Sequence, residues 1–193
     1  TIMKISLSPV VFFFQKIILS LSYYFFKMIG NQRNLTWVVG VDEIAANIKY
    51  ISDSLTGSYS VSLSKNRFYN FKYDYSLESR GNSKVDLVIR SFVGPVLLGY
   101  LLNNAKGFFY IFSTGFLLSN VDGRDYEFAY IKRKNKKLVC WFVGNDIRAP
   151  RKMIDFSKNS ENEVTANYYF LTAPQRLSDE YDNSKKIIAN ATD

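Results

Sequence analysis

The sequence contains no histidine and a single cysteine, Cys140. Without histidine, the residues given cannot form a Ser-His-Asp or Cys-His catalytic group, a histidine general base or a histidine metal site. One cysteine excludes a disulfide framework or a thiolate metal cluster within this chain, and is typical of a reducing compartment. Any chemistry must therefore rest on carboxylates, hydroxyls, amides, lysine, arginine and backbone dipoles.

Acidic residues are missing from the first part of the chain. None precedes Asp42, whereas Lys4, Lys16, Lys27 and Arg33 do. The 193 residues carry 25 Lys and Arg against 17 Asp and Glu, a formal charge of +8. Hydrophobic residues make up 47%, which is too much for a disordered chain and suits one well-filled core. Phenylalanine lies mostly inside apolar runs, so the high aromatic content favours core packing over base stacking.

Residues 1–30 predict an amphipathic helix. The pair Ser8-Pro9 is a good helix start, because serine caps the first turn and proline tolerates its first position. A helix spanning a membrane is not favoured, because Lys16 near its middle would cost about 2.5–3.5 kcal/mol. A signal peptide is not indicated either.

On a helical projection, polar residues of this segment share one face and apolar residues cover the opposite one. The apolar positions are Phe13, Phe14, Ile17, Leu21, Tyr24, Phe25 and Met28. This face is expected either to lie in a membrane interface with anionic lipids or to pack on the protein's own core or a partner domain. A buried strand over part of the segment is also compatible with its composition.

From Asn34 onward, strand and helix patterns alternate. Strands are predicted at 36–41, 59–63, 107–112 and 137–143, and helices from Asp42 to near Gly57 and at 85–102, 122–134 and 178–191. The helix at 85–102 is predicted to break at Gly94-Pro95, and 67–82 is predicted to be a loop. The alternation predicts an α/β fold: a Rossmann-like, doubly wound parallel sheet with helices on both faces, preceded by the N-terminal helix.

Ligands of such sheets bind at the carboxyl ends of the strands. Gly40 lies at the first such end, where helix amides can receive an anion, although the carboxylates of Asp42 and Glu43 oppose a phosphate. We interpret Asp42 as a helix N-cap. Thr114 and Gly115 follow a later strand, and either hydrogen-bond a sugar or phosphate or form a turn.

The third strand end carries the most specific motif, Gly144-Asn145-Asp146-Ile147-Arg148. Gly144 permits a sharp turn. Asp146 can accept from sugar hydroxyls or act as a base, and the Arg148 fork can hold a carboxylate or phosphate. The alternative is an internal Asp146–Arg148 pair with an Asx turn at Asn145.

The stretch 122–148 resembles the N-terminal half of bacterial GT-B glycosyltransferases. In that family a helix with a basic end leads to a Lys-Lys-apolar strand and a Gly-x-Asp-x-Arg loop, as in Lys136-Lys137-Leu138-Val139 and Gly144 to Arg148 here. Residues 37–45 are similar to the first strand and helix of that domain. Many relatives have histidine before the loop glycine, where this chain has Val143.

The resemblance implies that residues 31–193 are the acceptor-binding half of a nucleotide-sugar-dependent glycosyltransferase of the hexosyltransferase type, in capsule, O-antigen or exopolysaccharide synthesis. It implies Asp146 as the catalytic residue and Gly40, Thr114, Gly115, Gly144, Asn145 and Arg148 as substrate-binding residues. The resemblance implies a C-terminal domain that binds the nucleotide-sugar donor, which we expect to be missing from these residues, and the chain alone is therefore expected to be inactive.

The same resemblance implies metal-independent chemistry without a cofactor. The acceptor would be lipid-linked or a saccharide, and the location cytoplasmic, on the inner face of the membrane if the N-terminal helix binds it. Two alternatives remain. One is a non-enzymatic basic α/β module that binds nucleotides or nucleic acid, and the other is a structural membrane protein in which the N-terminal helix is the whole function.

Overall fold

The structure is a computed structural model that describes residues 9–30, 33–63, 70–77, 83–111, 115–118 and 124–142. These residues form, in chain order, α1 (Pro9–Ile29), β1 (Leu35–Gly40), α2 (Asn47–Ser54), β2 (Tyr59–Ser62), β3 (Tyr75–Ser76), α3 (Ser83–Asn104), β4 (Ala105–Ile111), α4 (Arg124–Arg133) and β5 (Lys137–Trp141). The predicted helix 178–191 lies outside the described residues.

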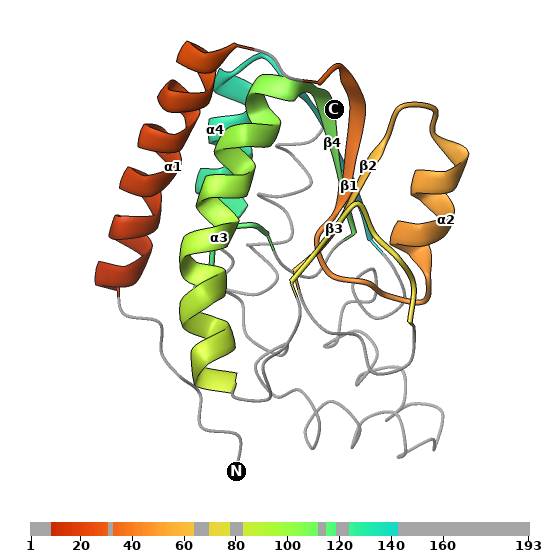
Figure 1. Ribbon diagram of the computed structural model, residues 1–193, viewed down its shortest axis with the longest axis horizontal. Coiled ribbons are helices and arrows are strands. Elements are labelled where there is room, and N and C mark those ends of the chain that lie inside the picture. Colours follow the sequence, from red (N-terminus) through yellow and green to blue (C-terminus); the bar gives the residue numbers. More distant parts are fainter. Residues whose placement is uncertain are drawn as a thin grey trace, which may run out of the picture.

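The strands form one sheet in the order β3-β2-β1-β4-β5, and every neighbouring pair is parallel. Helix α2 covers one face of the sheet, and α1, α3 and α4 lie on the other (Figure 1). A parallel sheet with helices on both faces confirms the predicted Rossmann-like architecture. The predicted N-terminal helix is confirmed over Pro9–Ile29, and Ser8, its predicted cap, lies outside the described residues.

Strand β4 contributes to the apolar packing on both faces of the sheet. Phe108 and Tyr110 belong to the larger core, together with buried leucines of α3. Ile111 belongs to a smaller cluster with Val39 and Ile48, beneath α2. Alternate side chains of a strand point to opposite faces, so a strand covered by helices on both sides is apolar throughout. The strand predicted at 107–112 is therefore confirmed, and it is packed on both faces.

Helix α3 is continuous through Gly94 and Pro95, so the predicted break is wrong. Beyond the proline, Leu98 and Leu101 are fully buried in the core, and this packing holds the helix together although proline lacks an N–H group. The two-residue strand β3 was also not predicted. It pairs with the edge of β2 through Tyr75, and two residues give no recognisable periodicity.

Helix α1 packs along α3. A Cβ atom on Gly99 would lie 2.7 Å from the Ser22 Cβ atom and 2.8 Å from the Tyr23 backbone nitrogen, so only glycine permits this approach. The Asn103 side chain donates a hydrogen bond of 3.0 Å to the Tyr23 carbonyl. Ring contacts also join α1 to α4, for example between Tyr23 and Tyr130. Helix α1 is therefore bound to the domain along one side.

The side of α1 that faces the domain carries its buried polar side chains, together with Leu19, which is fully buried in the core. Gln15 is 1% exposed and Ser22 is 9% exposed, whereas Leu21 is 66% exposed. Of the alternatives left open for the apolar side, packing on the protein's own core is therefore contradicted. Long polar side chains reach partners in the domain, as shown below for Gln15, and these contacts fix the orientation.

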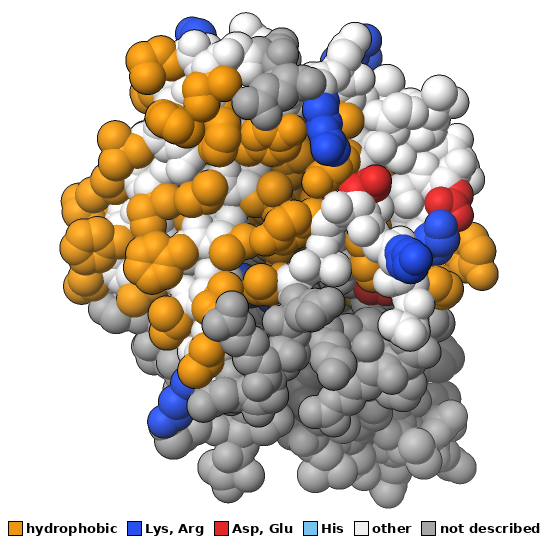
Figure 2. All heavy atoms as spheres, viewed as in Figure 1, with side chains coloured by type: hydrophobic (Ala, Val, Ile, Leu, Met, Phe, Trp, Pro, Cys, Tyr) orange, Lys and Arg blue, Asp and Glu red, His pale blue; other side chains and the backbone are white. Residues whose placement is uncertain are grey.

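The outward side of α1 and the neighbouring side of α3 form one surface, here called the apolar face. Figure 2 shows its hydrophobic side chains gathered over both helices, with basic side chains at its margins. Its exposed residues are Val10, Phe13, Phe14, Ile17, Leu21, Tyr24, Phe25, Met28 and Ile29 of α1, and Val85, Val88, Phe92 and Val96 of α3. Each helix is long and apolar enough to cross a membrane by length and composition.

Candidate functional site

The order of the strands reverses between β1 and β4. These strands are neighbours in the sheet, but the chain leaves β1 toward β2 and reaches β4 only after β3 and α3. In open parallel sheets, ligands bind at such a reversal, beside the carboxyl ends of the strands. The candidate site is therefore the edge where β1 ends at Gly40, β4 at Ile111 and β5 at Trp141.

An ion pair crosses this edge. The Arg90 guanidinium of α3 lies 3.5 Å from a carboxylate oxygen of Asp42, which follows β1. It also donates a hydrogen bond of 3.4 Å to the Gly115 carbonyl, which follows β4. The two charged side chains are only 13% and 15% exposed. The pair thus joins α3 to the segments that follow the two central strands, and each charge compensates the other.

Asp42 is not the N-cap of α2, contrary to our interpretation. The helix begins at Asn47, and Ala46 in the cap position provides no side-chain hydrogen bond. The neighbouring Glu43 takes that role instead, because its carboxylate accepts hydrogen bonds of 3.1 Å and 3.2 Å from the backbone N–H groups of Ile48 and Lys49. A carboxylate there is favoured by the partial positive charge of a helix N-terminus.

Glu43 also accepts a hydrogen bond of 3.0 Å from the Tyr73 hydroxyl. Burial raises the pKa of Tyr73 well above its ordinary value, and the negative charge of Glu43 and this hydrogen bond raise that pKa further. The N-terminus of α2 is where a nucleotide phosphate would bind in many folds of this class. In this chain a built-in carboxylate occupies it.

Glu127 of α4 fixes the segment 115–118 from inside. Its side chain is fully buried, and its carboxylate accepts hydrogen bonds of 3.0 Å and 2.8 Å from the backbone N–H groups of Phe116 and Leu117. The Tyr110 hydroxyl donates a short hydrogen bond to the same carboxylate. A buried carboxylate with three donors is well compensated, so its role here is to hold the backbone.

Gln15 holds the same segment from α1. Its side-chain amide donates a hydrogen bond of 2.9 Å to the Leu118 carbonyl and accepts one of 2.8 Å from the Leu118 N–H group. Together with Arg90 and Glu127, it provides side-chain partners for the backbone of every residue from Gly115 to Leu118. The edge beside β4 is therefore shaped by α1, α3 and α4 together.

The structure places two of the predicted binding residues, and both glycines have a packing role. A Cβ atom on Gly40 would lie 2.9 Å from the Val61 carbonyl oxygen, and one on Gly115 would lie 2.5 Å from a Glu127 oxygen. The other predicted site residues, Thr114, Gly144, Asn145, Asp146 and Arg148, lie outside the described residues. Strand β5 nevertheless ends beside β4, because Trp141 pairs with Ile111.

Sequence reasoning missed Arg90 and Glu127 as residues that shape the edge. Arg90 gave a usable signal, because it is the only charged residue between Asp86 and Lys106 in an otherwise apolar stretch. A charge isolated in this way is expected to have a partner in the fold. Glu127 gave no such signal, because it lies among other charged residues of a helix.

A second, polar depression of about 240 Å³ lies between α2, β2 and the segment before β3. Its acidic groups have partners: Asp53 pairs with Lys49 at 2.8 Å, and Asp74 accepts hydrogen bonds of 2.7 Å from the hydroxyl and N–H groups of Ser60. It is separate from the β1–β4 edge. Among the described residues, no cluster of His, Cys, Asp and Glu has the composition of a metal site.

Searches of protein-family models, of curated proteins and of solved structures find no match to this chain.

Proposed function

We propose that this chain is the acceptor-side half of a nucleotide-sugar-dependent glycosyltransferase that works at the cytoplasmic face of a membrane, in the synthesis of a surface polysaccharide. The observation that carries the proposal is the parallel alignment of β1, β4 and β5, whose carboxyl ends are neighbours at one edge. The residues that follow the last two strands include Thr114 and the Gly144 to Arg148 motif.

The chemistry of the described edge supports a saccharide over a nucleotide as its ligand. Asp42 and Arg90 compensate each other, and Glu43 occupies the N-terminus of α2. Among the described residues, the usual phosphate site of this fold class is thus taken by a carboxylate. An uncharged sugar, bound by hydroxyl, amide and carboxylate groups, suits this edge better than a nucleotide diphosphate.

In the proposed reaction, an acceptor hydroxyl attacks the anomeric carbon of a nucleotide-sugar. A new glycosidic bond forms, the bond to the nucleotide diphosphate breaks, and the hydroxyl proton passes to Asp146 as general base. Arg148 binds an anionic group of the acceptor, for example the pyrophosphate of a lipid-linked sugar. Cationic side chains and helix N-termini of a donor-binding domain would stabilise the departing diphosphate.

The test uses membranes from cells that express the protein encoded by its complete reading frame. Membranes are incubated with a panel of radiolabelled nucleotide-sugars, and label in the lipid and polysaccharide fractions is measured. Asp146→Asn should lower transfer by about 10²–10⁴-fold, the usual contribution of a general base. Asp53→Asn, an exposed carboxylate on α2, is the matched control and should transfer label like the parent protein. Transfer from no donor, or an unimpaired Asp146→Asn variant, contradicts the proposal.

A further inference from the structure

We propose that the apolar face is a membrane-docking surface, in which α1 lies in the plane of a bilayer that contains anionic lipid and α3 inserts beside it. This inference concerns the surface alone and stands independently of the reaction proposed for the β1–β4 edge.

The first observation is that every strongly polar group in the middle of α1 points inward. The side-chain amide of Gln15 is bonded to the Leu118 backbone through both its nitrogen and its oxygen. The ammonium group of Lys16 lies 4.5 Å from the ring centres of Phe12 and Tyr126. The lysine that argues against a membrane in the sequence therefore faces the domain, and the outward side of α1 carries no charge before Lys27.

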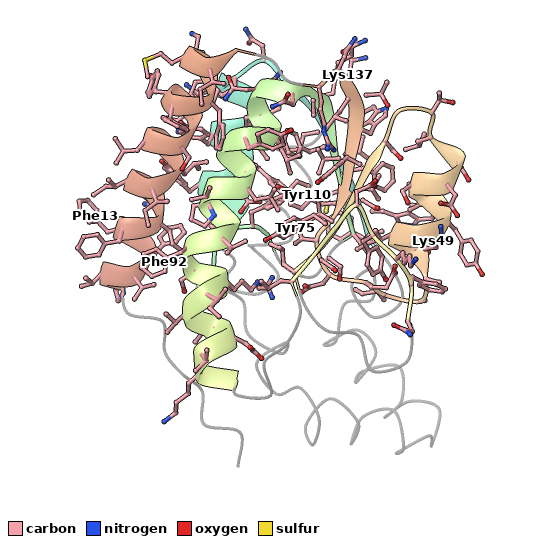
Figure 3. The ribbon with its side chains drawn as sticks, in the orientation of Figure 1. Phe13, Lys49, Tyr75, Phe92, Tyr110 and Lys137 are labelled. Atoms are coloured by element: carbon pink, nitrogen blue, oxygen red, sulfur yellow. The ribbon has the colours of Figure 1, made fainter. Side chains whose placement is uncertain are left out.

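The second observation is the width of the apolar surface. On α3, Val88, Phe92 and Val96 follow one another at four-residue intervals and are exposed, so they form a line along one side of the helix. In Figure 3, Phe13 and Phe92 point away from the sheet on the same side of the domain, whereas Tyr110 lies inside. Soluble proteins rarely expose so wide an apolar surface to water, which favours an apolar partner for it.

The third observation is the charge around this surface. Lys27 is exposed at the end of α1, and the ammonium group of Lys134 lies 5.2 Å from the ring of the outward Tyr24. Anionic headgroups are complementary to such a border. The sequences of α1 and α3 hold four basic residues and the single acidic Asp86. Lys16 and Arg90 of this set face the domain, whereas Lys27 and Lys84 are exposed near the ends of the two helices. A second copy of the chain would bring these basic margins together, which disfavours a dimer through this surface.

The inward contacts of α1 also determine how it meets the bilayer. A helix that spanned the membrane would have to leave α3, and would lose both the Gln15 contacts and the Asn103 hydrogen bond to Tyr23. With these contacts kept, only the outward side of the 21-residue helix reaches lipid. Helices of this kind insert about 5–10 Å into the interface.

Vesicle flotation tests the docking surface. The full chain is mixed with vesicles of phosphatidylcholine, with or without 30% phosphatidylglycerol, and the bound fraction is measured after flotation. The double variant Phe14→Gln and Phe92→Gln should bind about 100-fold more weakly, since each buried phenylalanine contributes roughly tenfold or more. Tyr50→Gln, which removes an exposed aromatic ring on α2, is the matched control and should bind like the parent.

Two outcomes of this experiment overturn the proposal. One is that the parent chain does not float with anionic vesicles, although its circular dichroism shows it folded. The other is that sedimentation shows a stable dimer in solution that the same double variant dissociates, which assigns the apolar face to a second copy. Equal loss of binding in the Tyr50→Gln control also contradicts a specific face.

The charge border is tested separately by Lys27→Gln, at the end of α1, and Lys134→Gln, which follows α4 and lies beside Tyr24. Each substitution should weaken binding to the phosphatidylglycerol vesicles by about fivefold and leave binding to pure phosphatidylcholine unchanged. Lys49→Gln on α2 is the control. Equal effects on both kinds of vesicle would show that the border does not recognise anionic lipid.

Spin labels measure whether α1 lies in the plane. On a Cys140→Ser background, Phe14→Cys, Leu21→Cys and Met28→Cys place labels seven residues apart on the outward side of α1. A helix in the membrane plane puts the three labels at similar depth. A spanning helix would separate the first and last by about 21 Å, and that gradient would overturn the in-plane arrangement.

Discussion

The two faces of the sheet are built alike inside and differently outside. On each face, a buried glutamate, Glu43 or Glu127, accepts hydrogen bonds from two consecutive backbone N–H groups and from a tyrosine hydroxyl. On the outside, α2 presents the ion pair between Lys49 and Asp53 to solvent, whereas α1 turns Gln15 inward and presents its apolar side.

This comparison shows that the outward-facing apolar side of α1 is the unusual feature of the protein. The interior beneath α1 follows the ordinary rules, with packed aromatic rings and compensated carboxylates. Helix α1 is unusual only in that its apolar side faces outward, here called its inverted orientation. We relate this orientation to the apolar partner proposed above for that surface. Polar partners inside the domain fix the helix, and the apolar side is left to interact with its surroundings.

The largest expected effect compares the two glutamates. Glu127→Ala should lower the free energy of unfolding by about 3–5 kcal/mol, because it leaves a tyrosine hydroxyl and two backbone N–H groups buried without their acceptor. Glu43→Ala should cost about 1–3 kcal/mol, because water can reach part of its site. Urea unfolding in a mild detergent measures both. A larger loss for Glu43→Ala would contradict the assignment of Glu127 as the more deeply buried anchor.

The next effect compares the two sides of α1. Gln15→Leu should destabilise the fold by about 1–3 kcal/mol although it adds an apolar side chain, because the Leu118 N–H and carbonyl groups lose their partners. Leu21→Gln should change the unfolding free energy by about 0.5 kcal/mol or less, because its side chain is exposed. Thermal unfolding of both variants decides the matter. A stable Gln15→Leu variant would contradict the inverted orientation.

The smallest effect concerns alkaline pH on the α2 face. The pKa of Tyr73 is raised above the ordinary value of 10.0, so the folded state favours the neutral hydroxyl. This contribution to stability is fully present below pH 10 and is lost as the pH rises above it. Tyr73→Phe should be slightly less stable at pH 7 and should lose less stability between pH 9 and pH 11. Parallel pH curves for the two proteins would contradict this linkage.

Much of the fold could be predicted because its signals are local. The strands that end at Gly40, Ile111 and Trp141 are short apolar runs with helical patterns between them, and such alternation implies a parallel sheet. The break at Gly94-Pro95 could not be judged in this way, since burial of the following turns keeps the helix continuous. The role of Asp42 was also misread, because its partner Arg90 is distant in the sequence.

The position of the candidate site could be predicted from the sequence, but the side chains that shape it could not. Parallel strands place the segments after β1, β4 and β5 at one edge whatever their sequences. The side chains that shape that edge come from three helices, and Glu127 resembles any other charged helix residue in the sequence. These side chains bind backbone groups that become their neighbours only after folding.

By itself, the sequence determined the order of most helices and strands, the direction of the strands and the amphipathic character of α1, because periodicity and short connections act over a few residues. Strand β3 and the continuity of α3 depended on tertiary packing. The tertiary structure alone decided which side of α1 faces inward. The backbone groups that bind Gln15 belong to Leu118, 103 residues further along the chain. The buried Gln15 amide is hydrogen-bonded through both its nitrogen and its oxygen, and this keeps its side of the helix inside. The apolar side is therefore left at the surface.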